Sequence, residues 1–268
     1  MSAALFRTTL KIHTPTILSY ALGTSVYLWL FIGVYPSLAK SSALNSLLQS
    51  LPPGMLQVIG YQSGVSQVGD FLAGEFYGLI YLIILAIYTV TTATKLMARS
   101  VDNGSMAYLL STPVSRTRVA LTEAAVLAVG IVVIGGVSTL AGILGVDWLV
   151  ASPNLNVRHF VEMNIVGVLL FCVIAGYCFL FSSLARDERT AAGMSAGLTM
   201  VFFAFKMVSA LGDHVSRLKY LSVFTVFQPQ DLIHGRGPVV STSLWLALAA
   251  AALFAAAVAG FRRREMSL

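Results

Sequence analysis

Long apolar stretches alternate with short polar segments along this chain, and almost every ionisable residue lies in the polar segments. A hydrocarbon core of about 30 Å requires about 20 helical residues, and each span must make its own backbone hydrogen bonds because lipid offers no partner. The stretches that meet this requirement are Ile17–Tyr35, Gly78–Thr94, Leu121–Leu144, Val161–Leu184, Ala191–Leu211 and Val239–Phe261. The pattern therefore predicts an all-α, polytopic membrane protein with six transmembrane helices.

The composition supports this fold class. Hydrophobic residues make up 57% of the 268 positions and charged residues only 10%, and a soluble domain could not bury that much apolar surface. Six spans and their connections use nearly the whole length. We therefore expect residues 1–268 to form a single membrane domain without a soluble catalytic domain. Cys172 and Cys178 fall on different faces of one predicted helix, so neither a disulfide nor a metal pair is expected.

The basic residues indicate an orientation. A net charge of +6 could suit a nucleic-acid partner, but Lys and Arg lie where predicted spans end, so membrane lipid explains them and no nucleic acid is expected. With a cytoplasmic N-terminus, eleven Lys and Arg residues lie on the cytoplasmic side and six on the other. The positive-inside rule then places both termini and the Lys95–Arg118 loop in the cytoplasm.

Three segments outside the spans are amphipathic. Residues Ser2–His13 mix apolar side chains with Arg7 and Lys11 and are followed by Pro15, which predicts a short N-terminal interfacial helix. The outer loop Pro36–Gly74 has apolar residues at helical spacing, so we expect a second interfacial helix there. The last outer loop, Gly212–Pro238, is expected to dip partly into the membrane without crossing it.

The sequence carries no signature of membrane-embedded catalysis. It has no zinc-binding His-Glu-x-x-His helix and no phosphate-binding loop, and its four histidines are scattered in or beside loops. Inside the spans the ionisable residues are Glu123, Glu162 and Lys206, each near a boundary or an outer end rather than at the midplane where ion coupling needs charge. We therefore expect no catalytic residue, metal or cofactor in this chain. If it transports, a partner supplies the energy.

The loop from Arg99 to Arg118 contains the most informative pattern. Ser100 or Asp102 is placed to cap a short helix, three apolar residues then form a ridge at three- and four-residue spacing, and a proline ends the helix. The predicted partner-binding residues are Asp102, Gly104, Met106, Leu109, Leu110, Pro113 and Arg116. A plain solvated loop is the alternative, but an apolar ridge has no reason to face the cytosol unless lipid or a partner covers it.

These residues resemble a known family: the second (type-2) permease class of ATP-binding cassette (ABC) transporters, in its six-span bacterial form. The resemblance rests on Asp102–Arg116, which reads acid-x-Gly-Ser and then Leu-Leu-Ser-x-Pro-Val-Ser-Arg, and on the terminal Phe261–Glu265. The chain departs from the family where Asp102 replaces the common Glu and Glu123 replaces a common Lys. The resemblance implies that Ser100–Ser111 is a coupling helix, which sits in a groove of a separate nucleotide-binding ATPase subunit.

The resemblance also implies a function and an assembly. The chain would be a permease subunit in the bacterial inner (plasma) membrane, exporting an amphiphilic, peptide or drug-like substrate by alternating access. Two copies, or this chain and a sibling permease, would pair with two nucleotide-binding subunits that hold ATP and magnesium. Two alternatives remain open: an ABC-type module for signalling or resistance without bulk export, and a non-transporting membrane scaffold.

Overall fold

The computed structural model describes residues 3–39, 67–106, 114–151, 154–210 and 213–263, with backbone alone for residues 39 and 213–216. Within these residues, six helical segments are long and apolar enough to cross a membrane. The first is α1 (Ala3–Ala39), and the second joins α4 (Val68–Phe71), η1 (Leu72–Ile80), α5 (Tyr81–Leu96) and α6 (Ala98–Asp102). The others are α8 (Arg116–Leu149), α9 (Val157–Leu184), α10 (Glu188–Ser209) and α12 (Val239–Arg263). The described chain is an all-α polytopic membrane protein, as its sequence predicts.

Most of these helices extend beyond the predicted spans. The second begins at Val68 rather than Gly78, so the expectation that a loop runs as far as Gly74 is wrong. The part that follows α4, η1, is a π-helix, a wider form of helix that is rare overall but frequent at functional sites. Apolarity marks the part of a helix inside lipid, whereas the helix itself continues through polar residues outside it. Most of the loop predicted to hold an outer interfacial helix lies outside the described residues.

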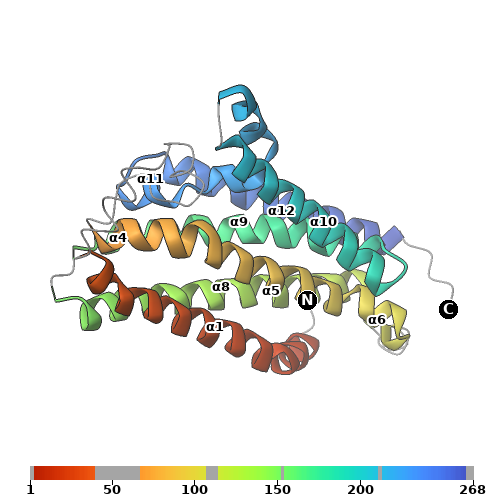
Figure 1. The fold of residues 1–268 in the computed structure, drawn as a ribbon. Helices are drawn as coiled ribbons and strands as arrows, with labels where there is room; N and C mark the ends of the chain where they lie inside the picture. Colours follow the sequence, from red (N-terminus) through yellow and green to blue (C-terminus); the bar gives the residue numbers. More distant parts are fainter. Residues whose placement is uncertain (1–2, 40–66, 107–113, 152–153, 211–212, 264–268) are drawn as a thin grey trace.

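The N-terminal segment is part of α1 rather than a separate helix, because α1 continues through Pro15. Proline has no N–H and cannot bond to the carbonyl of Lys11, which bends a helix without necessarily ending it. Figure 1 shows the first turns of α1 running in a different direction from the rest of the helix. The predicted end at Thr14–Pro15 is thus a bend instead of a break.

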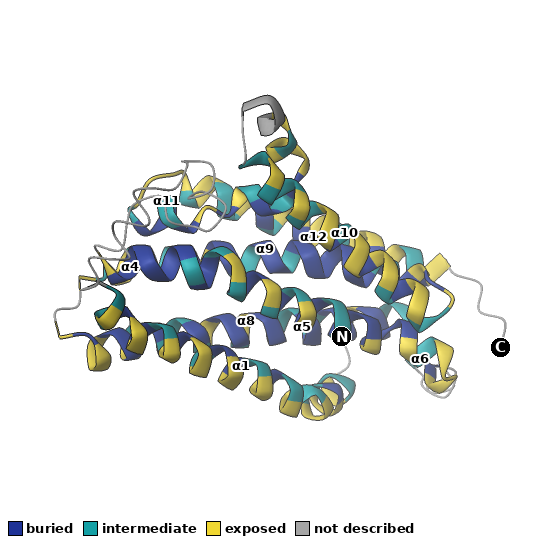
Figure 2. Cartoon of the chain, viewed as in Figure 1, coloured by how far each residue is buried: buried dark blue, intermediate teal, exposed yellow. Residues whose placement is uncertain are grey.

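Helix α9 forms the centre of the bundle. It contacts α12, α8, α5 and α10, whereas α1 packs mainly on α8. In their most apolar windows, 72% of α9 is buried but only 17% of α10. Figure 2 shows the same contrast as mostly blue and teal along the visible part of α9 and much yellow on α1 and α10. The close packing of α9 on α12 depends on Gly176, where a Cβ would lie 2.7 Å from the Cβ of Leu253.

The two ends of the bundle carry different connections. Figure 1 shows α6 (Ala98–Asp102) at one end, together with the N-terminal turns of α1 and the end of α12. At the opposite end lie α4 and α11 (Pro229–Ile233). The chain before α11 forms the 3-10 helices η2 (Asp213–Leu221) and η3 (Val223–Val226). Buried apolar side chains hold this region on the bundle: Phe224, Phe227, Leu232 and Ile233.

Candidate functional site

The second span breaks at Met97, immediately before the segment that the sequence singles out. Met97 has φ −116° and ψ −65°, and it separates α5 from α6. A serine of α9 bridges the break: the Ser182 hydroxyl donates to the carbonyl of Ala93 at 2.8 Å and accepts from the backbone N–H of Ala98 at 3.1 Å. Helix ends leave backbone groups without partners, and a single side chain serves both helices here. The direction of α6 is therefore tied to α9.

Small side chains let α6 approach the turn between α9 and α10. Ala98, Ala185 and Ala191 form a buried cluster of their own, separate from the main core. Alanine keeps the backbones close because its side chain is a single methyl group. Helix α6 accordingly contacts both α9 and α10.

Polar contacts fix the far end of α6 to the start of α10. A carboxylate oxygen of Asp102 accepts the backbone N–H of Glu188 at 3.3 Å. The Nε of Arg99 lies 3.8 Å from a carboxylate oxygen of Glu188. Asp102 thus places negative charge at the positive end of the α10 dipole. The Arg99–Glu188 pair is largely exposed, so we assign it no more than about 1 kcal/mol.

The start of α10 is also capped by the residue that immediately precedes it, Asp187. Asp187 accepts the backbone N–H of Thr190 at 2.7 Å and its hydroxyl at 2.8 Å. The backbone bond first, and then the hydroxyl bond, holds the pKa of the exposed Asp187 carboxyl below its ordinary value. This is an ordinary N-cap. The turn that receives α6 is therefore a well-defined structure.

The predicted helix Ser100–Ser111 is interrupted, which corrects the sequence prediction. Helix α6 ends at Asp102, and the chain turns at Asn103 and Gly104, where Gly104 has φ +74°. The Asn103 side chain accepts the N–H of Ser105 at 3.0 Å, which stabilises this turn. A left-handed φ favours glycine because other residues have a Cβ that clashes. The Asn-Gly pair was a turn signal in the sequence.

The predicted partner-binding residues have different environments. Asp102 and Gly104 are exposed, and Arg116, the first residue of α8, is half-buried. Met106 is only 4% exposed and belongs to the main hydrophobic core, so its expected place on an exposed ridge is wrong. Leu109, Leu110 and Pro113 lie outside the described residues. The residues that sequence reasoning missed are Ser182 and Glu188, whose roles arise from contacts between segments far apart in the chain.

The opposite end of the bundle has a polar pocket of about 180 Å³. Its lining includes Asp70, whose side chain is 4% exposed, and His234, whose Nε2 lies 2.7 Å from the Asp70 carboxylate. The remaining lining residues are Gln67, Gly69, Asn154, Leu155, Asn156, His159 and Ile233. Among the described residues, no group of three His, Cys, Asp or Glu side chains is placed to hold a metal ion. The pocket lies between α4 and the end of α11.

Comparison with known proteins assigns nearly all of the chain to one family. A family model described as ABC-2 family transporter protein matches residues 10–266. A search of curated proteins finds no match. The matched range takes in all of α6, the Asn103–Gly104 turn and the helices to which α6 is fixed.

Proposed function

Because this chain belongs to the ABC-2 family of transporter proteins and is a membrane permease module, we propose that it exports an amphiphilic, peptide or drug-like substrate by alternating access. A separate ATPase subunit drives the transport. The chain forms one permease domain that works in the bacterial inner membrane. Nucleotide and magnesium bind to the ATPase subunit, and this chain carries no catalytic residue.

The attachment of α6 is the observation that supports this proposal most directly. A segment that receives a push from an ATPase must pass it to the spans instead of bending away. Helix α6 continues from α5, is bonded to α9 through Ser182 and meets the start of α10 through Asp102. A force applied here reaches three spans at once. The loop that follows supplies the apolar contact through Leu109 and Leu110, as their sequence pattern suggests.

The exposed faces of the bundle support a paired assembly in lipid. Large apolar side chains are exposed on α1, α10 and α12, among them Leu22, Met200 and Trp245. Such faces require lipid or a second membrane subunit to cover them. We propose that two permease copies, or this chain and a sibling, form the membrane core and bind two ATPase subunits. The end that carries α6 then faces the cytoplasm.

The proposal is tested with the purified complex in lipid vesicles. The ATPase subunit should copurify with the permease, and the complex should hydrolyse ATP and move substrate, whereas the permease alone should do neither. Leu109→Glu should uncouple hydrolysis from transport while leaving membrane insertion intact, because a carboxylate would replace an apolar contact. Ser105→Glu is the control, since it places the same charge at an exposed position of the same loop.

Native mass spectrometry gives the stoichiometry of the same complex. A mass corresponding to two permease chains and two ATPase subunits is expected. A stable permease monomer that moves substrate without an ATPase would contradict the proposal. Equal transport by the Leu109→Glu and Ser105→Glu variants would remove the coupling role of the loop.

A further inference from the structure

Ser182 connects two spans at the point where one of them bends. Its hydroxyl is fully buried and bonds to backbone atoms on both sides of Met97, the carbonyl of Ala93 in α5 and the N–H of Ala98 in α6. A side chain that bonds only within its own helix has no such effect on a neighbour. The α5–α6 angle therefore depends on an atom that belongs to α9.

The other attachments of α6 lie on the same side of the bend. Ala98 packs with Ala185 and Ala191, Arg99 approaches Glu188, and Asp102 accepts the Glu188 N–H. Both ends of α6 are thus held by the α9–α10 turn, whereas its connection to α5 passes through the broken helix at Met97. A bend that lacked the Ser182 bridge would absorb movement of α6 before it reached α5.

We propose that Ser182 is a positioning residue that makes α6 move as one body with the start of α10 and the end of α9. This inference rests on the proposed function, in which α6 receives the movement of an ATPase. Its consequence is a path for that movement: from α6 into α9, the most buried span, and from there to the helices packed around it. The path does not require α5 to transmit the force alone.

The neighbouring residue provides a matched control. Ser183 is also fully buried, but its hydroxyl donates to the carbonyl of Phe179 in its own helix at 2.7 Å. Ser182→Ala and Ser183→Ala remove the same atom from adjacent buried positions. Ser182→Ala removes the bonds to Ala93 and Ala98, whereas Ser183→Ala leaves both in place, so a difference between the two variants reports the bridge instead of a general loss of packing.

The first experiment measures rigidity in the permease without any ATPase. Spin labels are attached through Ser105→Cys and Arg189→Cys, both at exposed positions, in a chain with Cys172→Ala and Cys178→Ala. Pulsed electron paramagnetic resonance should give a narrow distance distribution for the parent chain and for Ser183→Ala. Ser182→Ala should broaden the distribution at least twofold. Equal widths for the two serine variants would overturn the proposal.

An exposed variant keeps the test decisive if Ser182→Ala does not fold. Asp102→Ala removes the second attachment at an exposed position, where loss of folding is not expected. It should broaden the same distribution, because α6 would then be held only by the Ser182 bridge and the alanine contacts. An unchanged distribution in Asp102→Ala, with Ser182→Ala unfolded, would also overturn the proposal.

The second experiment separates this inference from the proposed function. The permease with its ATPase subunit is labelled at the opposite end through Trp148→Cys and Val240→Cys, at positions 69% and 84% exposed. Adding ATP and vanadate should shift this distance in the parent complex and in Ser183→Ala. The shift should fall by at least half in Ser182→Ala at an unchanged rate of ATP hydrolysis. No shift in the parent complex would contradict the proposed function, whereas equal shifts in both serine variants would contradict the role of Ser182.

Discussion

The hydroxyl oxygen of Tyr88 lies where a side chain at Gly130 would have to go, since an ideal Cβ at Gly130 would be 1.8 Å from it. Tyr88 is fully buried, and its ring packs edge-on against Tyr20 with centroids 5.2 Å apart. Helix α5 therefore approaches α8 through an aromatic side chain seated on a glycine. A methyl group at Gly130 could therefore be accommodated only if the Tyr88 side chain or one of the two helices moved.

Gly130→Ala is expected to destabilise the protein by about 1–3 kcal/mol, the usual cost of an overpacked core. Gly136→Ala is the control, because no atom lies within 4 Å of the Cβ it would add in the same helix. In a helix interior this control should be neutral or slightly stabilising. The melting temperature in detergent distinguishes the two variants. Equal melting temperatures would show that Tyr88 moves aside without cost.

The six spans are predictable from sequence because lipid imposes one requirement on every stretch of about 20 residues. The positions at which the helices begin and end are harder to predict from sequence. The second helical segment, for example, begins at Val68 and includes the charged Asp70, so apolarity alone does not identify where it starts. The bend at Pro15 was visible as a proline, but a proline alone does not tell a bend from a helix end.

The candidate site is predictable only in part, because some of its contacts join residues that are far apart in the sequence. The Asn103–Gly104 turn depends only on neighbouring residues, and Asn and Gly are residue types that predict a turn. Ser182 reaches Ala98 across 84 positions, and nothing in the local pattern distinguishes it from Ser183. Met106 occurs at the spacing of a helical ridge, but spacing does not say whether the ridge meets a partner or the core of its own chain.

The Asp70–His234 pair is expected to hold α11 on α4. The carboxylate is almost fully buried, and Ile233 packs beside Gly69, where a Cβ would lie 3.1 Å from the Ile233 Cγ1. Asp70→Asn and His234→Gln should each lower the free energy of unfolding. Because the two groups share one contact, the double variant should lose less than the sum, with a coupling of about 0.5–3 kcal/mol. Additive losses in the double-mutant cycle would show that the pair contributes no mutual stabilisation.

The Thr9–Glu123 hydrogen bond is expected to hold the N-terminal turns of α1 against α8. The Thr9 hydroxyl donates to a carboxylate oxygen of the buried Glu123 at 3.2 Å. Thr9→Val keeps the shape but removes this donor, so hydrogen exchange in the first turns of α1 should become faster. Thr8→Val is the control, because the exposed Thr8 hydroxyl donates only within its own helix, to Ala4. Equal exchange rates in the two variants would show that other contacts hold this segment.

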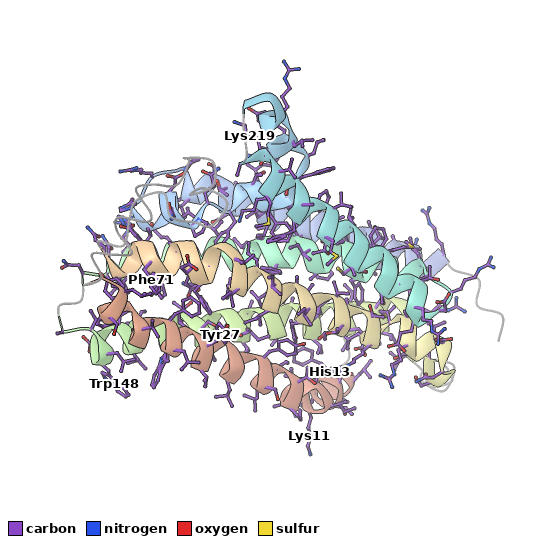
Figure 3. The ribbon with its side chains drawn as sticks, in the orientation of Figure 1. Lys11, His13, Tyr27, Phe71, Trp148 and Lys219 are labelled. Atoms are coloured by element: carbon purple, nitrogen blue, oxygen red, sulfur yellow. The ribbon has the colours of Figure 1, made fainter. Side chains whose placement is uncertain are left out.

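The residues at the two ends of the bundle predict its orientation in the membrane. Figure 3 shows Lys11 and Trp148 toward opposite ends of the layer formed by α1 and α8. The basic residues Arg99, Arg186 and Arg262 belong to elements at the α6 end, whereas the indole of Trp148 is 69% exposed at the other. Lys and Arg favour the cytoplasmic side of a membrane, and Trp favours either interface. The α6 end should therefore be cytoplasmic.

Cysteine labelling in intact cells tests this orientation, in a chain with Cys172→Ala and Cys178→Ala. An impermeant maleimide added outside should label Tyr220→Cys, because Tyr220 is 80% exposed in η2, beyond the end of α10 opposite to α6. The same reagent should label Ser105→Cys only after the cells are permeabilised, since the basic residues around Ser105 keep its loop in the cytoplasm. Labelling of Ser105→Cys in intact cells would show that the bundle has the opposite orientation in the membrane. The α6 segment would then be out of reach of any cytoplasmic ATPase, and the coupling role proposed for it would fail.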